Sequence, residues 1–152
     1  MKKIFTLLSI CLATGLSFGQ VGAVAPDFTQ TDLDGTSHTL YDYLGQGKVV
    51  IVDMSATWCG PCVAETPNIV KSYKKWKGKG FEVVTISFDK DPAKARAYLA
   101  KKKVNWFNIA DGLGFKSPLA KNFTIRGIPQ IMLIGRDGRV YANGLRGAEI
   151  GA

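Results

Sequence analysis

Histidine and cysteine are scarce in this sequence, which has one histidine and three cysteines among its 152 residues. A single histidine excludes a multi-histidine metal centre, and so few sulfur and nitrogen ligands exclude a zinc finger as well. Long apolar runs are also missing after the first twenty residues. No later segment approaches the ~20 apolar residues of a membrane-spanning helix. We therefore expect no metal site, no other cofactor and no membrane span beyond the N-terminus.

Acidic residues are in the minority, with 12 of them against 20 lysines and arginines, and the formal net charge is +8. Hydrophobic residues make up 46% and charged residues 21%. This is the composition of a globular domain and excludes a disordered or collagen-like chain. We interpret the lysines of segments 71–79 and 101–103 as solvated helix faces and expect no nucleic-acid partner.

The N-terminus has the three parts of a secretory signal peptide. Lys2 and Lys3 give a positive start, residues 4–16 are mostly apolar, and Ser17 and Gly19 are the small residues before a cleavage site. We expect residues 1–19 to be a signal peptide, residues 20–152 to be one domain, and the protein to be secreted or periplasmic. The alternative is an uncleaved segment that tethers the domain to a membrane, although its apolar stretch is short for a span.

The pattern of apolar residues predicts an α/β domain. Apolar, β-branched runs at 48–54 and 81–88 suit central strands that are covered on both faces. Further extended segments are expected at 27–40 (two pieces around a turn), 105–110, 128–134 and 139–143. Helices are expected at 40–47, 59–77, 91–102 and 117–122. Alternating strands and helices followed by a hairpin indicate a three-layer α/β fold, with a central mixed sheet flanked by helices.

The close pair Cys59 and Cys62 lies where a predicted buried strand passes into a helix. Signal cleavage would remove Cys11 and leave this pair alone in an oxidising compartment, where it can form a disulfide. A zinc site would need two more ligands, and only His38 remains, which we expect on an exposed strand. Haem attachment requires a histidine after the second cysteine, and Val63 is there. A structural disulfide with so small a loop would add little stability, so redox chemistry is favoured.

The position of the pair supports this chemistry. At a helix N-terminus the dipole and the unpaired N–H groups favour the thiolate of Cys59, which is the form that attacks a disulfide. Cys62, one turn further into the helix, is then the resolving thiol. Pro61 lacks an N–H and suits the first turn of a helix.

The segment Trp58-Cys59-Gly60-Pro61-Cys62 resembles the active site of thioredoxin (thioredoxin is also a standard example of a lowered cysteine pKa). The resemblance extends to Asp53, at the position of the buried acid that takes a proton from the resolving cysteine. It includes Pro67, which matches a proline that kinks the active-site helix. Ile128-Pro129 matches the cis-proline loop that lies against the cysteines and binds substrate. The resemblance to thioredoxin implies that Trp58, Gly60 and Pro61 contact the substrate as well.

Other features are similar to the exported TlpA/ResA-like branch of thioredoxin-fold thiol–disulfide oxidoreductases. They are the Ala25-Pro26-Asp27-Phe28 lead-in, an additional strand and helix within 88–111, and Glu65, at the place of a functional glutamate in some members. The resemblance covers about residues 23–147. It implies protein disulfides as substrates, a membrane electron donor, and a role in cell redox homeostasis or cytochrome c maturation.

Three features depart from the pattern of this branch. Asp53 with Gly60-Pro61 is closer to true thioredoxin, and Gln130 stands where thioredoxins have threonine. Family members continue past 146–147 into a final helix, so we expect this C-terminal helix to be missing. A peroxidase of the same fold would need threonine and proline before the cysteine, where Ala56 and Val52 stand.

We therefore predict a protein-disulfide reductase that acts outside the cytoplasm. Reduced Cys59 attacks the substrate disulfide, and Cys62 resolves the mixed disulfide with help from Asp53. The alternatives are a disulfide oxidase or isomerase, and a thioredoxin-fold binding module without catalysis.

Overall fold

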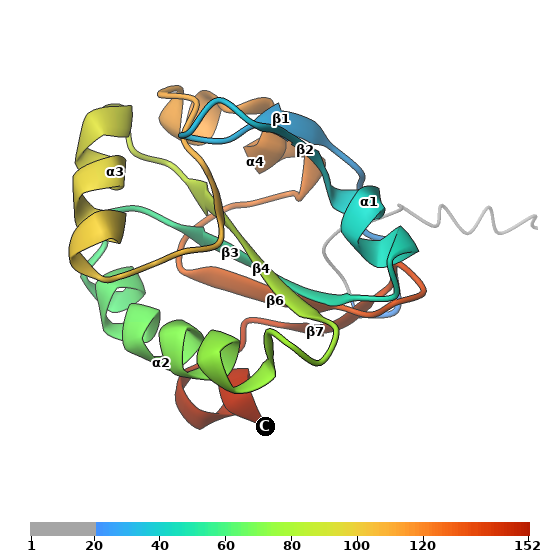
Figure 1. Ribbon diagram of the computed structural model, residues 1–152. Coiled ribbons are helices and arrows are strands. Elements are labelled where there is room, and N and C mark those ends of the chain that lie inside the picture. Colours follow the sequence, from blue (N-terminus) through green and yellow to red (C-terminus); the bar gives the residue numbers. More distant parts are fainter. Residues whose placement is uncertain (1–20) are drawn as a thin grey trace, which may run out of the picture.

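The computed structural model describes residues 21–152, and the expected signal peptide lies outside these residues. Its centre is a five-stranded sheet with the order β5-β4-β3-β6-β7 (Figure 1). β3 pairs in parallel with β4 and antiparallel with β6, so the sheet is mixed as predicted. The strands are β3 Val49–Ser55, β4 Phe81–Ser87, β5 Phe107–Ile109, β6 Gln130–Ile134 and β7 Val140–Asn143.

Helices cover both faces of this sheet. One face packs against α1 and α4, and the other against α2 and the C-terminal 3₁₀ helix η2. α3 lies at the β5 end of the molecule (Figure 1). A separate two-stranded sheet, β1 Thr29–Thr31 with β2 Ser37–Thr39, turns at Asp34-Gly35. The helices are α1 Leu40–Gly45, α2 Gly60–Trp76, α3 Pro92–Lys101 and α4 Pro118–Asn122, with 3₁₀ helices η1 Gly114–Lys116 and η2 Gly147–Gly151.

The central strand β3 alternates between the two faces, because successive side chains of a strand point in opposite directions. Val50, Val52 and Met54 belong to the core beneath α1 and α4, whereas Ile51 belongs to the core beneath α2. Asp53 has the same parity as Ile51. The strand therefore places the one acidic residue of β3 on the face that α2 covers.

The C-terminal residues 147–151 form η2 rather than a long helix, and η2 packs on α2. The Ser72 hydroxyl donates a hydrogen bond of 2.8 Å to the carbonyl of Ile150, whose side chain is buried. Within 21–152, no helix has the length and apolar character needed to cross a bilayer.

The predicted helices and strands are confirmed, with ends that differ by one or two residues. The expectation for His38 is wrong: it lies on β2, but it is half-buried. Its ring stacks on Phe107, with 3.8 Å between centroids, and its two nitrogens face Asp32 and Tyr43. This packing joins β2 to β5, far apart in the chain, and a pattern of short polar strands does not reveal it.

Candidate active site

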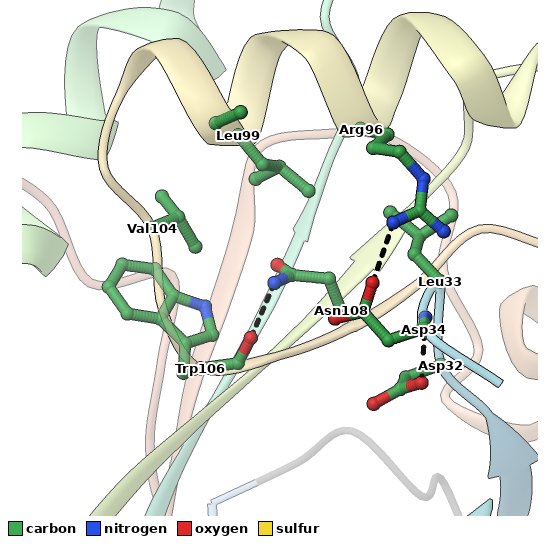
Figure 2. Close-up of a pocket in the computed structure, with 9 residues that line it drawn as sticks. Asp32, Leu33, Asp34, Arg96, Leu99, Val104, Trp106 and Asn108 are labelled. Carbon is green, nitrogen blue, oxygen red and sulfur yellow. Dashed lines mark hydrogen bonds and ion pairs between the residues drawn. The ribbon is translucent and has the colours of Figure 1, made fainter. Parts of the chain in front are cut away.

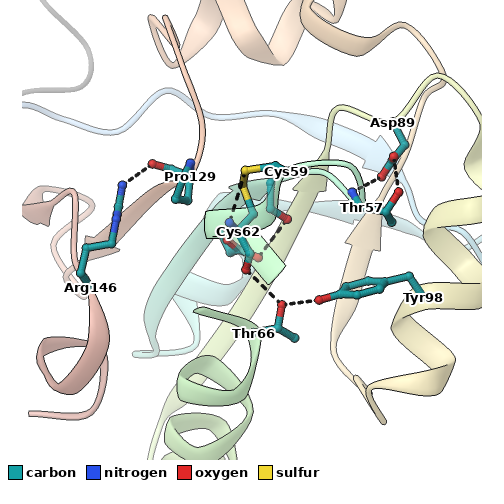
Figure 3. The surroundings of a disulfide bond; sticks show 10 residues. Thr57, Cys59, Cys62, Thr66, Asp89, Tyr98, Pro129 and Arg146 are labelled. Atoms are coloured by element: carbon teal, nitrogen blue, oxygen red, sulfur yellow. Dashed lines mark hydrogen bonds between the residues drawn. A yellow bond between two sulfur atoms is a disulfide. The ribbon is translucent and has the colours of Figure 1, made fainter. Parts of the chain in front are cut away.

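The two cysteines form a disulfide at the junction of β3 and α2 (Figure 3). Cys59 is the N-cap of α2, and its Sγ accepts a hydrogen bond of 3.3 Å from the backbone N–H of Cys62. A sulfur in this position faces the positive end of a 17-residue helix, which favours a thiolate. Gly60 and Pro61 form the exposed first turn, with proline at the position where its missing N–H is harmless.

Both cysteines are largely buried, with 6% and 4% of their surface exposed. They belong to the same apolar cluster as the residues beneath α1 and α4, and Ile128 packs against that cluster. The neighbouring Trp58 is the opposite case, because 61% of its surface is exposed. The accessible surface of the two sulfurs is therefore small, and the residue next to them in the chain is largely exposed.

The Ile128-Pro129 peptide bond is cis, as the resemblance to thioredoxins implied. The carbonyl of Pro129 accepts a hydrogen bond of 2.5 Å from Arg146 Nη2, and Arg146 Nη1 donates to the carbonyl of Leu145 (Figure 3). Arg146 thus fixes the loop to the segment before η2. Sequence reasoning missed this residue, because a lone arginine near the C-terminus has no motif.

The Asp53 side chain is buried, with 7% of its surface exposed. It forms no ion pair with any residue of 21–152. Burial raises its pKa to about 7, although hydroxyl donors and the charge of Arg146 act in the opposite direction. The donors are Thr85 Oγ1 at 3.3 Å and Ser55 Oγ at 3.4 Å. Near neutral pH this carboxyl can both accept and release a proton.

A tryptophan orients one of these donors. Trp106 Nε1 donates a hydrogen bond of 2.9 Å to Thr85 Oγ1. An indole N–H is only a donor, so the threonine hydroxyl uses its lone pair for Trp106 and directs its proton toward Asp53. This order of contacts was not predicted, because it joins β3, β4 and the residue before β5.

Glu65 lies one turn beyond Cys62 but serves mainly as a structural contact. Its Oε2 accepts hydrogen bonds from the Asn68 side chain at 2.8 Å and from the Gly147 N–H at 2.9 Å. It connects α2 to η2, and its charge also raises the pKa of Asp53. The structure gives Glu65 no contact with the disulfide.

A second contact fixes the loop that carries Trp58 and Cys59. The carboxylate of Asp89 accepts hydrogen bonds from the Thr57 N–H at 3.0 Å and from the Thr57 hydroxyl at 2.7 Å (Figure 3). Ser87 adds a third at 2.7 Å. Asp89 is 3% exposed, so it is a buried carboxylate whose hydrogen bonds join the end of β4 to the start of α2. It was also missed.

A separate pocket lies between the β1–β2 turn and α3 (Figure 2). Arg96 and Asp34 form an exposed ion pair of 2.6 Å across its mouth. Inside, Asn108 donates to the carbonyl of Trp106, and its Oδ1 has no hydrogen-bond partner in the described chain. Trp106 lines this pocket and also donates to Thr85 in the Asp53 network, but neither cysteine lines it. Among residues 21–152, no three histidine, cysteine or acidic side chains are grouped as a metal would require.

Comparisons with known proteins agree with this geometry. The model of the AhpC/TSA family matches residues 21–143. A protein named thiol-disulfide oxidoreductase ResA from Bacillus thuringiensis is 29% identical, over 91% of this chain and 83% of its own length. A protein of the same name from Bacillus cereus is 31% identical, over 80% of this chain and 67% of its own length.

Two solved structures are similar over most of the chain. The thioredoxin domain of a thiol-disulfide oxidoreductase from Bacteroides vulgatus has a TM-score of 0.78 and 31% identity, over 86% of this chain and 92% of that one. A putative thiol:disulfide interchange protein DsbE from Chlorobium tepidum has a TM-score of 0.75 and 32% identity, over 86% and 90%.

Proposed function

The chain belongs to the AhpC/TSA family and is a thiol–disulfide oxidoreductase of thioredoxin fold, and from this we propose that it is a protein-disulfide reductase acting outside the cytoplasm. The observation that carries the proposal is the position of Cys59 Sγ. It is the cap of a long helix and lies beside an exposed tryptophan and a cis-proline loop. This is a site for a nucleophilic sulfur that meets an extended polypeptide.

The reaction moves two electrons from the protein to its substrate. The Cys59 thiolate attacks one sulfur of the substrate disulfide, which forms a mixed disulfide and releases the first substrate thiolate. Cys62, once deprotonated, attacks Cys59 Sγ. This step closes the Cys59–Cys62 disulfide and releases the second thiolate, which takes up a proton. A donor of two electrons must then reduce the protein disulfide, and we assign this role to a membrane partner.

Asp53 is the proposed acceptor of the Cys62 proton. Its pKa of about 7 lets it hold a proton in one half of the cycle and release it in the other. It shares the sheet face that α2 covers, which places it behind the active-site helix. The proposed contacts for the substrate chain are Trp58, Gly60, Pro61, Ile128 and Pro129. For Glu65 we propose only an electrostatic effect on Asp53.

The N-terminal pattern supports an extracytoplasmic location, because it has a positive start, an apolar segment and small residues before Gln20. Determination of the N-terminal residue of the protein recovered from its native cell tests this, with Gln20 expected after cleavage. An intact Met1 in a soluble fraction would contradict it. On the resemblance to the exported TlpA/ResA-like branch, we propose exported proteins such as apocytochrome c as substrates.

The reductase activity is tested with insulin and dithiothreitol, where the protein should accelerate precipitation of the insulin chains. In the Cys62→Ser variant, mixed disulfides with substrate should accumulate through Cys59. The matched Cys59→Ser variant should not accumulate them. Accumulation in the second variant alone would reverse the two roles.

The direction of the reaction is tested by the equilibrium reduction potential against glutathione. The reduction potential of a reductase should be close to that of thioredoxin, about −270 mV. That of an oxidase would be close to the value of DsbA, about −120 mV. A disulfide that does not exchange at all would support the binding module instead.

A further inference from the structure

A groove of about 550 Å³ lies beside the disulfide, on the side of Trp58. Three parts of the chain line it: the loop before α2, the segment that runs from the end of β4 into the first turn of α3, and the turn that contains η1. Trp58, which lines the groove, directly precedes Cys59 in the chain. The groove therefore begins one residue from the nucleophilic sulfur, within reach of a polypeptide held there.

Three aromatic rings form the wall of this groove. Phe88 is buried, and Phe115 stacks on it with 4.8 Å between centroids and 8° between the ring planes. The ring centroids of Trp58 and Phe115 are 6.3 Å apart. Trp58 and Phe115 nevertheless keep 61% and 47% of their surface exposed. Two large rings exposed side by side next to a reactive group are typical of a binding surface.

The chain holds this wall in place by specific contacts. Gly112 and Gly114 have positive φ angles of 75° and 57°, which only glycine adopts without strain. A Cβ on Gly114 would lie 3.4 Å from the carbonyl oxygen of Phe88, an ordinary contact distance, so the requirement for glycine comes from the backbone conformation. On the other side, the bonds from Thr57 to Asp89 tie the Trp58 loop to the end of β4. Both walls are therefore fixed to one strand.

The acidic and basic side chains at the rim of the groove differ in whether they already have partners within the protein. The Asp89 carboxylate is used by Thr57 and Ser87, and Asp91 caps α3 by accepting from the Ala93 N–H. Lys90 and Lys94 line the groove, and neither forms an ion pair within residues 21–152. The formal charges of the two lysines and the two aspartates cancel, but either ammonium group is available to pair with a carboxylate of a bound polypeptide.

We propose that this groove is a specificity subsite that binds an aromatic side chain of the substrate polypeptide, with an acidic residue next to it against Lys90 and Lys94. The aromatic side chain lies on Trp58 and Phe115 while the adjacent cysteine of the substrate faces Cys59. The inference rests on the proposed reductase function and names the polypeptide segment that this function selects. Apolar contact supplies most of the selectivity, because exposed charge pairs contribute little.

Two peptides test the subsite, each closed by one internal disulfide and differing only beside the first cysteine. One carries Trp-Glu there and the other Ser-Gln. The wild-type protein should reduce the first with a kcat/KM about tenfold higher, since an aromatic contact of about 1.4 kcal/mol gives this factor. In the Phe115→Ser variant this ratio should fall to about one at high salt, where the contribution of the lysines is screened. In Lys94→Glu it should fall by about twofold to threefold at low salt only, because salt screens exposed charges.

Leu113→Ser is the matched control, since Leu113 is 49% exposed on the same turn but does not line the groove. It should keep the wild-type ratio. A ratio that survives in Phe115→Ser, or that is lost equally in Leu113→Ser, overturns the subsite.

Binding is measured separately by NMR titration of the oxidised protein with the Trp-Glu peptide in which serine replaces both cysteines. Shifts at the Phe115 ring without any peptide reduction would sustain the subsite and refute the reductase. Reduction of both peptides at equal rates, without shifts at Phe115, would refute the subsite and sustain the reductase. If neither shifts nor reduction occur, both proposals are refuted.

Discussion

At the scale of single residues, Asp53 shows how burial can tune a carboxyl group without an ion pair. Two hydroxyl donors and a more distant arginine favour the ionised form, yet desolvation dominates and raises the pKa to about 7. The ordinary value for aspartate is near 3.8. Between these two values the folded protein keeps a proton that the unfolded chain releases.

This difference predicts that Asp53 makes the fold less stable as pH rises. The free energy of unfolding should fall by about 4 kcal/mol between pH 4 and pH 8, at about 1.4 kcal/mol for each unit of pKa difference. Asp53→Asn should remove this fall, so the variant gains on the wild-type protein most above pH 7. Urea unfolding of the oxidised proteins at pH 4 and pH 8 measures it.

The exposed carboxylate of Asp42 provides the control. Asp42→Asn should follow the wild-type pH dependence. A parallel pH dependence in Asp53→Asn and the wild-type protein would contradict the assigned origin of the effect.

At the scale of elements, local patterns were enough to predict most helices and strands. The β-branched runs of β3 and β4, the proline after Asp91 and the Asp137-Gly138 turn each specify their structure within a few residues. The cysteine pair and Pro129 were found because they match a known spacing. Sequence patterns did not reveal four other residues, because their contacts join elements far apart in the chain. These are Thr85, Asp89, Trp106 and Arg146. Such contacts depend on how distant elements are placed in space, which local periodicity does not determine.

The turn before α4 gives a prediction at this scale. Gly114→Ala should destabilise the protein by about 1–2 kcal/mol, because its φ of 57° is unfavourable for alanine. It should also displace Phe115 and lower the peptide preference described above.

Gly45→Ala is the comparison within the same chain. Gly45 ends α1 without a positive φ and has open space around it. Alanine there should be neutral or stabilising by up to about 1 kcal/mol. Thermal unfolding of the two variants checks both signs, and equal losses would show that glycine flexibility in the η1 turn is unimportant.

At the scale of the whole molecule, the redox state of one disulfide is coupled to the stability of the fold. The two sulfurs lie in the apolar cluster that also holds α1 and α4 against the sheet. A reductase requires that the folded protein favour its disulfide over its dithiol, since only then does the dithiol pass on electrons readily.

We therefore predict that the oxidised protein unfolds at a higher urea concentration than the reduced protein. Each difference of about 30 mV in potential between the folded and unfolded chain corresponds to about 1.4 kcal/mol of this stability. Unfolding curves with and without excess dithiothreitol at pH 7 measure the difference. A more stable reduced form would instead indicate an oxidase.

The small exposure of Cys59, 6% beside a tryptophan exposed to 61%, has a consequence for the kind of molecule that can react. In-line attack requires the substrate sulfur to descend to a nucleophile that barely reaches the surface. A disulfide buried inside a compact protein is held back by the bulk around it, whereas a disulfide on an exposed or extended segment can enter. Under the proposed function, the protein thus discriminates by conformation as well as by sequence. It would reduce disulfides in chains that have not yet folded and leave the disulfides buried in folded proteins intact.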